Sequence, residues 1–175
     1  AFFALTVSLA IFTSPDWRRE PNDPPIADGG RLSRLCAVTT GLIYLQSIFG
    51  AVLRHTGERI DAHLFFALLV TVHVIFILLR TMKFHAHRPK LIWPARVLAT
   101  LLLLQLMLGV GSYLGKFTSM LGLQMMVLVI LTTTHMVIGA LMLATSLLLT
   151  LRAYRFSTTA KASIGRKILT EQFSG

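Results

Sequence analysis

The segment Ala62–Leu79, AHLFFALLVTVHVIFILL, contains no charged side chain and is bordered by Asp61 and Arg80. A hydrocarbon layer about 30 Å thick needs roughly 20 apolar residues of helix, so this segment predicts one crossing of a membrane. Two histidines, His63 and His73, are its only ionisable residues. The segment therefore indicates lipid as the solvent of this chain and singles out two polar groups inside it.

Three further uncharged runs have the same character and complete a set of four expected spans. They are Leu35–Leu53, Val97–Gly115 and Leu131–Leu151. The last belongs to a longer run that begins at Phe117, which is too long for one crossing, so we place a break near Gly122 and an interfacial or re-entrant segment over Phe117–Ile130. The expected fold is all-α, an integral membrane four-helix bundle over residues 35–155.

The composition agrees with a membrane protein. Apolar residues make up 54% of the chain and charged residues 14%, whereas soluble domains have about 25% charged residues. The net charge of +10 would suit a nucleic-acid partner only if the basic residues shared one surface, and they are distributed by loop instead. We expect no nucleic-acid partner. The single cysteine, Cys36, permits no internal disulfide and is expected only to pack.

The two ends of the chain lie outside the expected bundle. Residues 1–13 are apolar but too few to cross a membrane, and the run stops at Thr13-Ser14-Pro15. We interpret this stretch as the end of a truncated transmembrane helix, followed by a cytoplasmic loop over residues 14–34. Residues 156–175 are expected to form a cytoplasmic tail.

The basic residues predict the orientation of the bundle. Nearly all Lys and Arg lie before the first span, between the second and third spans, or in the tail. The opposite side has only Arg54, Arg59 and Lys116. Because short cytoplasmic loops carry an excess of Lys and Arg, the C-terminus is expected in the cytoplasm.

The four spans form two repeated helix pairs. Gln46 in the first span and Gln105 in the third are each followed four residues later by a glycine, Gly50 or Gly109. We interpret these glycines as sites of close helix packing. In the second and fourth spans, His63 precedes Arg80 by the same number of residues as His135 precedes Arg152.

This equal spacing predicts that His63 and His135 lie at equal depth, near the outer face. Each has a small residue four positions later, Ala67 or Gly139, on the same helix face, which leaves room for a flat ligand. Two imidazoles on diagonal helices of a four-helix bundle are suited to the axial positions of a heme iron. The alternative is that each histidine only forms a hydrogen bond with a neighbouring helix.

Of the remaining polar residues, three cations are candidates for contacts with the heme, and three histidines are not expected to bind it. Arg54, Arg59 and Lys116 are the only outer cations and could pair with heme propionates, or else lie at the lipid headgroups. His73 is about 15 Å deeper than His63, so we expect it to pack or to form a hydrogen bond. His85 and His87 belong to a solvated basic loop.

At this point the sequence resembles the heme A synthase family, membrane enzymes that oxidise a methyl group of heme O to the formyl group of heme A. The matching stretches are Leu45-Gln46 through Gly50-Ala51-Val52-Leu53-Arg54-His55-Thr56-Gly57, and Thr134-His135 through Gly139-Ala140-Leu141 to Leu149-Thr150-Leu151-Arg152-Ala153. The chain is similar to the C-terminal four-helix half of that eight-helix family.

The resemblance implies that His63 and His135 hold a heme b in a bacterial inner membrane. It assigns catalysis to an N-terminal half, so no residue of this chain receives a catalytic role. Three functions remain open: the heme-holding half of a heme A synthase-type oxidoreductase, a cytochrome b-like subunit of a respiratory complex, and a heme-free structural membrane subunit. Association with the N-terminal half, with partner membrane subunits or with further copies of the chain is compatible with each.

Overall fold

The structure, a computed structural model, describes residues 2–18, 29–117 and 124–173, and this part of the chain contains helices and no strand. In chain order the helices are α1 (Phe2–Thr13), α2 (Pro15–Arg18), α3 (Gly29–Thr56), α4 (Ile60–His85), α5 (Pro89–Phe117) and α6 (Met125–Phe173). The last four are each long and apolar enough to cross a membrane. The protein is therefore an all-α membrane helical bundle, as the sequence predicts.

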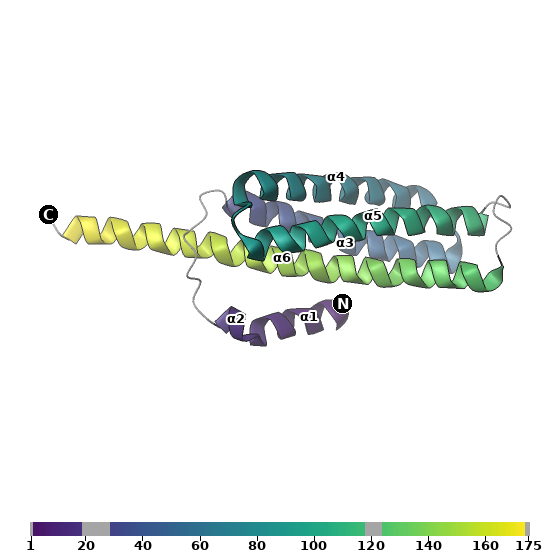
Figure 1. The fold of residues 1–175 in the computed structure, drawn as a ribbon, viewed down its shortest axis with the longest axis horizontal. Coiled ribbons are helices and arrows are strands. Elements are labelled where there is room, and N and C mark those ends of the chain that lie inside the picture. The colour runs from purple at the N-terminus through teal and green to yellow at the C-terminus, as the bar shows by residue number, and fades with distance from the viewer. Residues whose placement is uncertain (1, 19–28, 118–123, 174–175) are drawn as a thin grey trace.

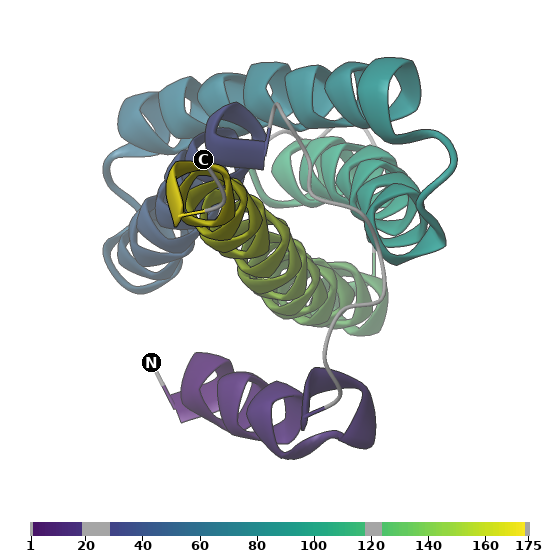
Figure 2. The ribbon, with the colours of Figure 1, turned by 90° about the vertical axis from the view of Figure 1, so that its left-hand side faces the viewer.

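The four long helices form a ring in which each contacts two neighbours (Figures 1 and 2). α3 packs against α4 and α6, and α5 packs against the same two helices. In the described residues, the backbones of α4 and α6 are not neighbours, and neither are those of α3 and α5. The expectation that the second and fourth spans are diagonal is confirmed. α1 packs on α6, on the side away from α4 (Figure 2).

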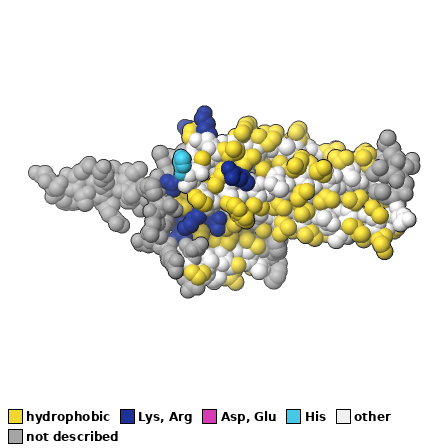
Figure 3. Space-filling view, viewed as in Figure 1, with side chains coloured by type: hydrophobic (Ala, Val, Ile, Leu, Met, Phe, Trp, Pro, Cys, Tyr) yellow, Lys and Arg dark blue, Asp and Glu magenta, His cyan; other side chains and the backbone are white. Residues whose placement is uncertain are grey.

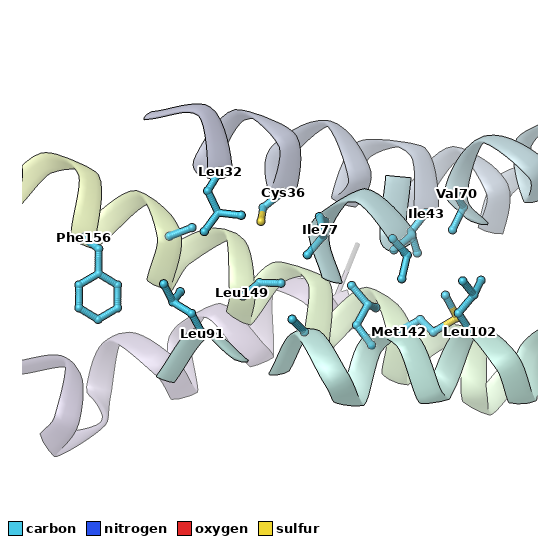
Figure 4. Close-up of a cluster of buried hydrophobic side chains, with 14 residues drawn as sticks. Leu32, Cys36, Ile43, Val70, Ile77, Leu91, Leu102, Met142, Leu149 and Phe156 are labelled. Carbon is cyan, nitrogen blue, oxygen red and sulfur yellow. The ribbon is translucent and has the colours of Figure 1, made fainter. Parts of the chain in front are cut away.

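The buried apolar side chains form one cluster (Figure 4), and along the helices it lies toward the end of the bundle where α4 joins α5. The buried side chains nearest the middle are Ile43, Val70, Leu102 and Met142, one from each long helix. Beyond this level no described residue of the bundle is buried, although the helices remain apolar. The packed half ends where α4 joins α5, and Lys and Arg side chains gather there (Figure 3). We call this the basic end and the opposite one the histidine end.

Pro94 lies inside α5 and shows how the basic end is held together. A proline has no N–H, so the carbonyl oxygen four residues earlier, that of Lys90, loses its helical donor. Arg152 of α6 donates from Nη1 to this oxygen at 3.1 Å. The proline thus provides an acceptor that joins α5 to α6.

The helix boundaries differ from the predicted spans mainly at the last one. α6 begins at Met125 and continues unbroken past Leu131, so the interfacial or re-entrant segment predicted over Phe117–Ile130 is wrong for residues 125–130. Those residues are apolar and include no Gly or Pro, and they simply extend the span. The predicted break near Gly122 lies outside the described residues. α6 also continues as a helix to Phe173, through the expected tail.

The N-terminal helix ends where the sequence predicts. α1 stops at Thr13, whose hydroxyl donates to the Leu9 carbonyl oxygen at 2.8 Å. Ser14 Oγ then accepts from the Trp17 backbone N–H at 3.3 Å and caps the short helix α2. Pro15 begins α2, a position that suits its missing N–H.

Candidate functional site

Four polar side chains, one from each long helix, lie close together at one level of the bundle. Gln46 Nε2 of α3 is 3.3 Å from His63 Nε2 of α4, and Gln105 Nε2 of α5 is 3.2 Å from His135 Nε2 of α6. The centres of the two imidazole rings are 6.5 Å apart. We call these four residues the histidine layer. The structure thus brings the two predicted histidines together, each beside a glutamine from the neighbouring helix.

The histidine layer begins where the buried core ends. Ile43 precedes Gln46 by the same number of residues as Leu102 precedes Gln105. Val70 and Met142 follow His63 and His135 at equal spacing. The internal repeat therefore sets both the depth of the layer and the depth of the core boundary beneath it.

The turn between α3 and α4 sets the height of His63. Gly57 has a φ of 75°, a left-handed conformation that favours glycine, and Arg59 has a φ of 65° and precedes α4. The Arg59 carbonyl oxygen accepts from the His63 backbone N–H at 3.1 Å, so His63 lies in the first turn of α4. The turn determines where α4 begins, and the beginning of α4 determines the height of the His63 imidazole in the bundle.

Two glycines border the imidazole rings. A Cβ added at Gly50 would lie 3.2 Å from His63 Cε1, and one added at Gly109 would lie 3.2 Å from His135 Cε1. These distances are shorter than nine in ten Cβ contacts in proteins. Each ring therefore lies against the backbone of the neighbouring helix at a position where a side chain would push it away.

The polar atoms of the histidine layer are only half satisfied. Each glutamine amide pairs with one ring nitrogen, which leaves His63 Nδ1 and His135 Nδ1 buried without a hydrogen-bond partner. The oxygens Gln46 Oε1 and Gln105 Oε1 are also buried without a partner. Exchanging the amide oxygen and nitrogen changes which atoms are unpaired but not their number. Orphaned polar atoms in a low-dielectric interior are costly, and four of them lie in this layer.

The ring separation tests whether a metal fits between the imidazoles. A metal ion binds an imidazole nitrogen at about 2.0 Å, so two rings on one ion have centres roughly 6 Å apart. The observed 6.5 Å is close to this value. The described residues contain no group of three or more His, Cys, Asp or Glu that could hold a metal ion. A metal in this layer would have two protein ligands, the number that heme iron takes along its axis.

The small residues predicted to make room for a ligand have a different neighbour. A Cβ added at Gly139 would lie 3.2 Å from Gln105 Nε2, so the space beside Gly139 holds the glutamine amide. Ala67, its counterpart on α4, is half-buried one turn from His63. The Gln105 side chain is long enough to reach from α5 to α6. The prediction of space beside Gly139 considered α6 alone and did not include this side chain from α5.

The three predicted outer cations lie at the histidine end and are exposed. Arg54 is in the last turn of α3, Arg59 precedes α4, and Lys116 is in the last turn of α5. The Arg54 guanidinium contacts the sulfur of Met136, which follows His135 in the chain. This places one cation beside the histidine layer, and the pairing of all three with propionates stays a prediction.

His73 is separate from the layer. Its Nδ1 donates to the Leu69 carbonyl oxygen at 2.8 Å within α4, which confirms the hydrogen-bonding role expected from its depth. It lines a groove on the outside of the bundle between α3 and α4. His73 therefore provides a matched control for the two histidines of the layer.

Sequence reasoning missed the roles of Gln46, Gln105, Gly50 and Gly109 in this site. The signal was present, because the repeated glutamine-to-glycine spacing is plain in the sequence. It predicted helix packing only, since spacing along one helix does not reveal which side chain on the next helix it meets. Ser112, on the same face of α5 as Gln105, also has a buried hydroxyl oxygen without a partner.

The fold and the site together define a membrane four-helix bundle with a paired-histidine layer near one end. No protein-family profile, curated protein or solved structure matches this chain. The geometry and chemistry of the layer itself are therefore the basis for proposing a function.

Proposed function

We propose that His63 and His135 are the axial ligands of a heme b. We further propose that the chain is the C-terminal, cofactor-holding part of a heme A synthase-type membrane oxidoreductase. One observation carries the cofactor proposal: the centres of two imidazoles from diagonal helices are 6.5 Å apart, with the ring planes at 62°, and each ring has a buried nitrogen without a hydrogen-bond partner. Neutral imidazole is a common axial ligand of heme iron.

Heme b, when bound, supplies a reversible one-electron iron couple. The chain's own residues would do the rest. His63 and His135 would bind the heme iron, and Gly50 and Gly109 let the rings lie against the helix backbones. Gln46 and Gln105 orient the rings through their amide groups. Exposed Arg54, Arg59 and Lys116 would bind the two propionates.

The half of the bundle at the histidine end favours the proposal of a large apolar cofactor. Its helices have the apolar composition of the packed half, yet none of its described residues is buried. A macrocycle held between the helices would cover side chains that the protein alone leaves partly exposed. Burial of this apolar surface favours binding at roughly 25 cal/mol per Å².

The assignment to heme O oxidation rests on the two sequence stretches that resemble the heme A synthase family. In this proposal the reaction takes place in an N-terminal half or on a partner membrane subunit, and this chain relays electrons or stabilises the assembly. A cytochrome b-like subunit is the second candidate, because the same layer would serve an electron carrier without further residues. We place the basic end in the cytoplasm of a bacterium and the histidine layer toward the outer face of its inner membrane.

The test is an optical difference spectrum, reduced minus oxidised, of the purified protein, with a pyridine extract to identify the heme. We expect low-spin b-type bands in the wild type. His63→Ala and His135→Ala should each lose most of the bound heme, because either leaves the iron with one protein ligand. His73→Ala is the matched control and should keep it.

Heme-free wild-type protein that is folded and intact would contradict the cofactor proposal. Equal loss of heme in the His73 variant would place the ligands elsewhere. If heme binds as expected, turnover of heme O by the chain together with its N-terminal part distinguishes the oxidoreductase from a cytochrome b-like carrier. A carrier would give the same spectrum without converting heme O.

A further inference from the structure

A groove of about 770 Å³ lies between α3 and α4 at the basic end. It is far from the histidine layer along the helices and does not depend on the function proposed above. Four of its lining residues are cations, two from each helix: Arg31, Arg34, Arg80 and Lys83. The groove thus combines opposed basic side chains from two antiparallel helices.

Among the residues that the structure describes, the charged side chains lining the groove are of one sign. Its described lining residues include no Asp or Glu. The Arg80 guanidinium carbon and Lys83 Nζ lie 5.5 and 5.4 Å from the centre of the Phe84 ring, which keeps both cations beside the groove. Four cations on two adjoining helices repel one another, so a bound anion would stabilise the groove.

The rest of the lining is apolar and continues toward the middle of the bundle. Val38, Phe76 and Leu79 line the groove and are more than half exposed, at 53%, 55% and 57%. Leu35 adds a half-buried side chain, and His73 lies about 10 Å deeper than Arg80. The groove is basic at the level of the membrane surface and apolar at the level of the hydrocarbon.

We propose that this groove binds an anionic phospholipid, with its phosphate among the cations of α3 and α4 and an acyl chain along the apolar lining. Basic pockets between membrane helices recognise anionic headgroups in this way. A free phosphate would use only the basic part and leave the apolar side chains uncovered. The lipid matches both parts, which favours it over an inorganic anion.

The position of the groove on the bundle agrees with an open, lipid-facing surface. α1, the described N-terminal helix, packs on α6 and not on α3 or α4. α4 lies on the opposite side of the bundle from α1 (Figure 2). Lipid can therefore reach the groove from the membrane without crossing this part of the chain.

Native mass spectrometry of the whole chain in detergent tests the proposal. We add phosphatidylglycerol or zwitterionic phosphatidylcholine at equal concentration and compare the bound fractions. The wild type should bind phosphatidylglycerol at least tenfold more strongly, in line with the contribution of several basic residues. Arg34→Gln with Lys83→Gln should weaken phosphatidylglycerol binding roughly thirtyfold and leave phosphatidylcholine unchanged.

The matched control is Lys90→Gln with Arg96→Gln, which removes the same charge from exposed residues of α5 at the same end. This pair should leave binding nearly unchanged. Equal loss in both pairs, or no preference for phosphatidylglycerol in the wild type, would overturn the proposal. Displacement of the lipid by millimolar inorganic phosphate would show that the groove binds anions in general, and it would also overturn the lipid proposal. Circular dichroism of each variant establishes that the helices are intact, and the wild-type comparison stands even if a variant misfolds.

Discussion

Gly50 and Gly109 decide where the two imidazole rings can lie. Each permits a ring to lie against the neighbouring backbone, because the nearest ring carbon is 3.2 Å from where a Cβ would be. A side chain larger than hydrogen would require the ring to shift by a few tenths of an ångström, and the same ring is held by its glutamine partner. The position of both proposed ligands therefore depends on residues that have no side chain at all.

We expect Gly50→Val and Gly109→Val to reduce heme binding while leaving the bundle folded. Overpacking of this kind typically costs about 1–3 kcal/mol, so heme affinity should fall roughly tenfold or more. The measurement is heme content after titration with hemin, followed by the absorbance of the bound form. The two variants should behave alike because the contacts repeat.

Gly41→Val serves as the control for these glycine variants. Gly41 is also in α3, and no atom lies within 4 Å of a Cβ added there. It should bind heme as the wild type does. If it loses as much heme as Gly50→Val, the loss comes from the helix and not from the ring contact.

The sequence predicted the histidines of the layer but not its full membership. His63 and His135 could be found because equal spacing to an arginine can be measured along the chain. Gln46 and Gln105 could not, because their roles depend on the rotation of α3 and α5 about their axes. A contact between two helices depends on how they pack, and the residue spacing within one helix gives no information about that packing.

At the level of elements, α3 and α6 are joined by hydroxyl groups inside the packed half. Thr40 Oγ1 lies 2.6 Å from Ser146 Oγ and 2.9 Å from Thr150 Oγ1. Hydrogen bonds between membrane helices contribute about 0.6 kcal/mol on average and about 1.7 kcal/mol at most. This cluster fixes the rotation of α6, the helix that carries His135.

Thr40→Val should lower the free energy of unfolding by about 0.6–1.7 kcal/mol, because it removes both contacts while keeping the shape of the side chain. Reversible unfolding in mixed micelles measures the change. A double-mutant cycle with Ser146→Ala isolates the interhelical part. Thr145→Val is the control, because the Thr145 hydroxyl donates at 2.8 Å only to the Leu141 carbonyl oxygen of its own helix. A cycle with no coupling would show that the cluster does not hold α3 to α6.

The boundaries of the elements were predicted unevenly, for physical reasons. The end of α1 at Thr13 was found because Ser14 and Pro15 are local signals of helix termination. The start of α6 was placed too late, because the apolar run around Met125 has no capping residue to mark a boundary. Capping residues and prolines locate the end of a helix, whereas hydropathy gives only a range of residues within which the helix begins or ends.

At the scale of the whole molecule, packing and polarity are divided between the two ends. Buried apolar side chains fill the basic half, whereas the histidine half has none among its described residues. A helix bundle held firmly at one end can open at the other without losing its fold. This division agrees with the proposal that heme binds between the helices at the histidine end.

The same division predicts the orientation of the chain, because the excess of Lys and Arg at the basic end places that end in the cytoplasm. Glu58, between α3 and α4, and His87, between α4 and α5, are both exposed and lie at opposite ends. In a Cys36→Ala background, Glu58→Cys should react with a membrane-impermeant maleimide added to spheroplasts. His87→Cys should react only after lysis. The reverse pattern would invert the bundle and place the histidine layer near the cytoplasm, and labelling of both before lysis would exclude a single orientation.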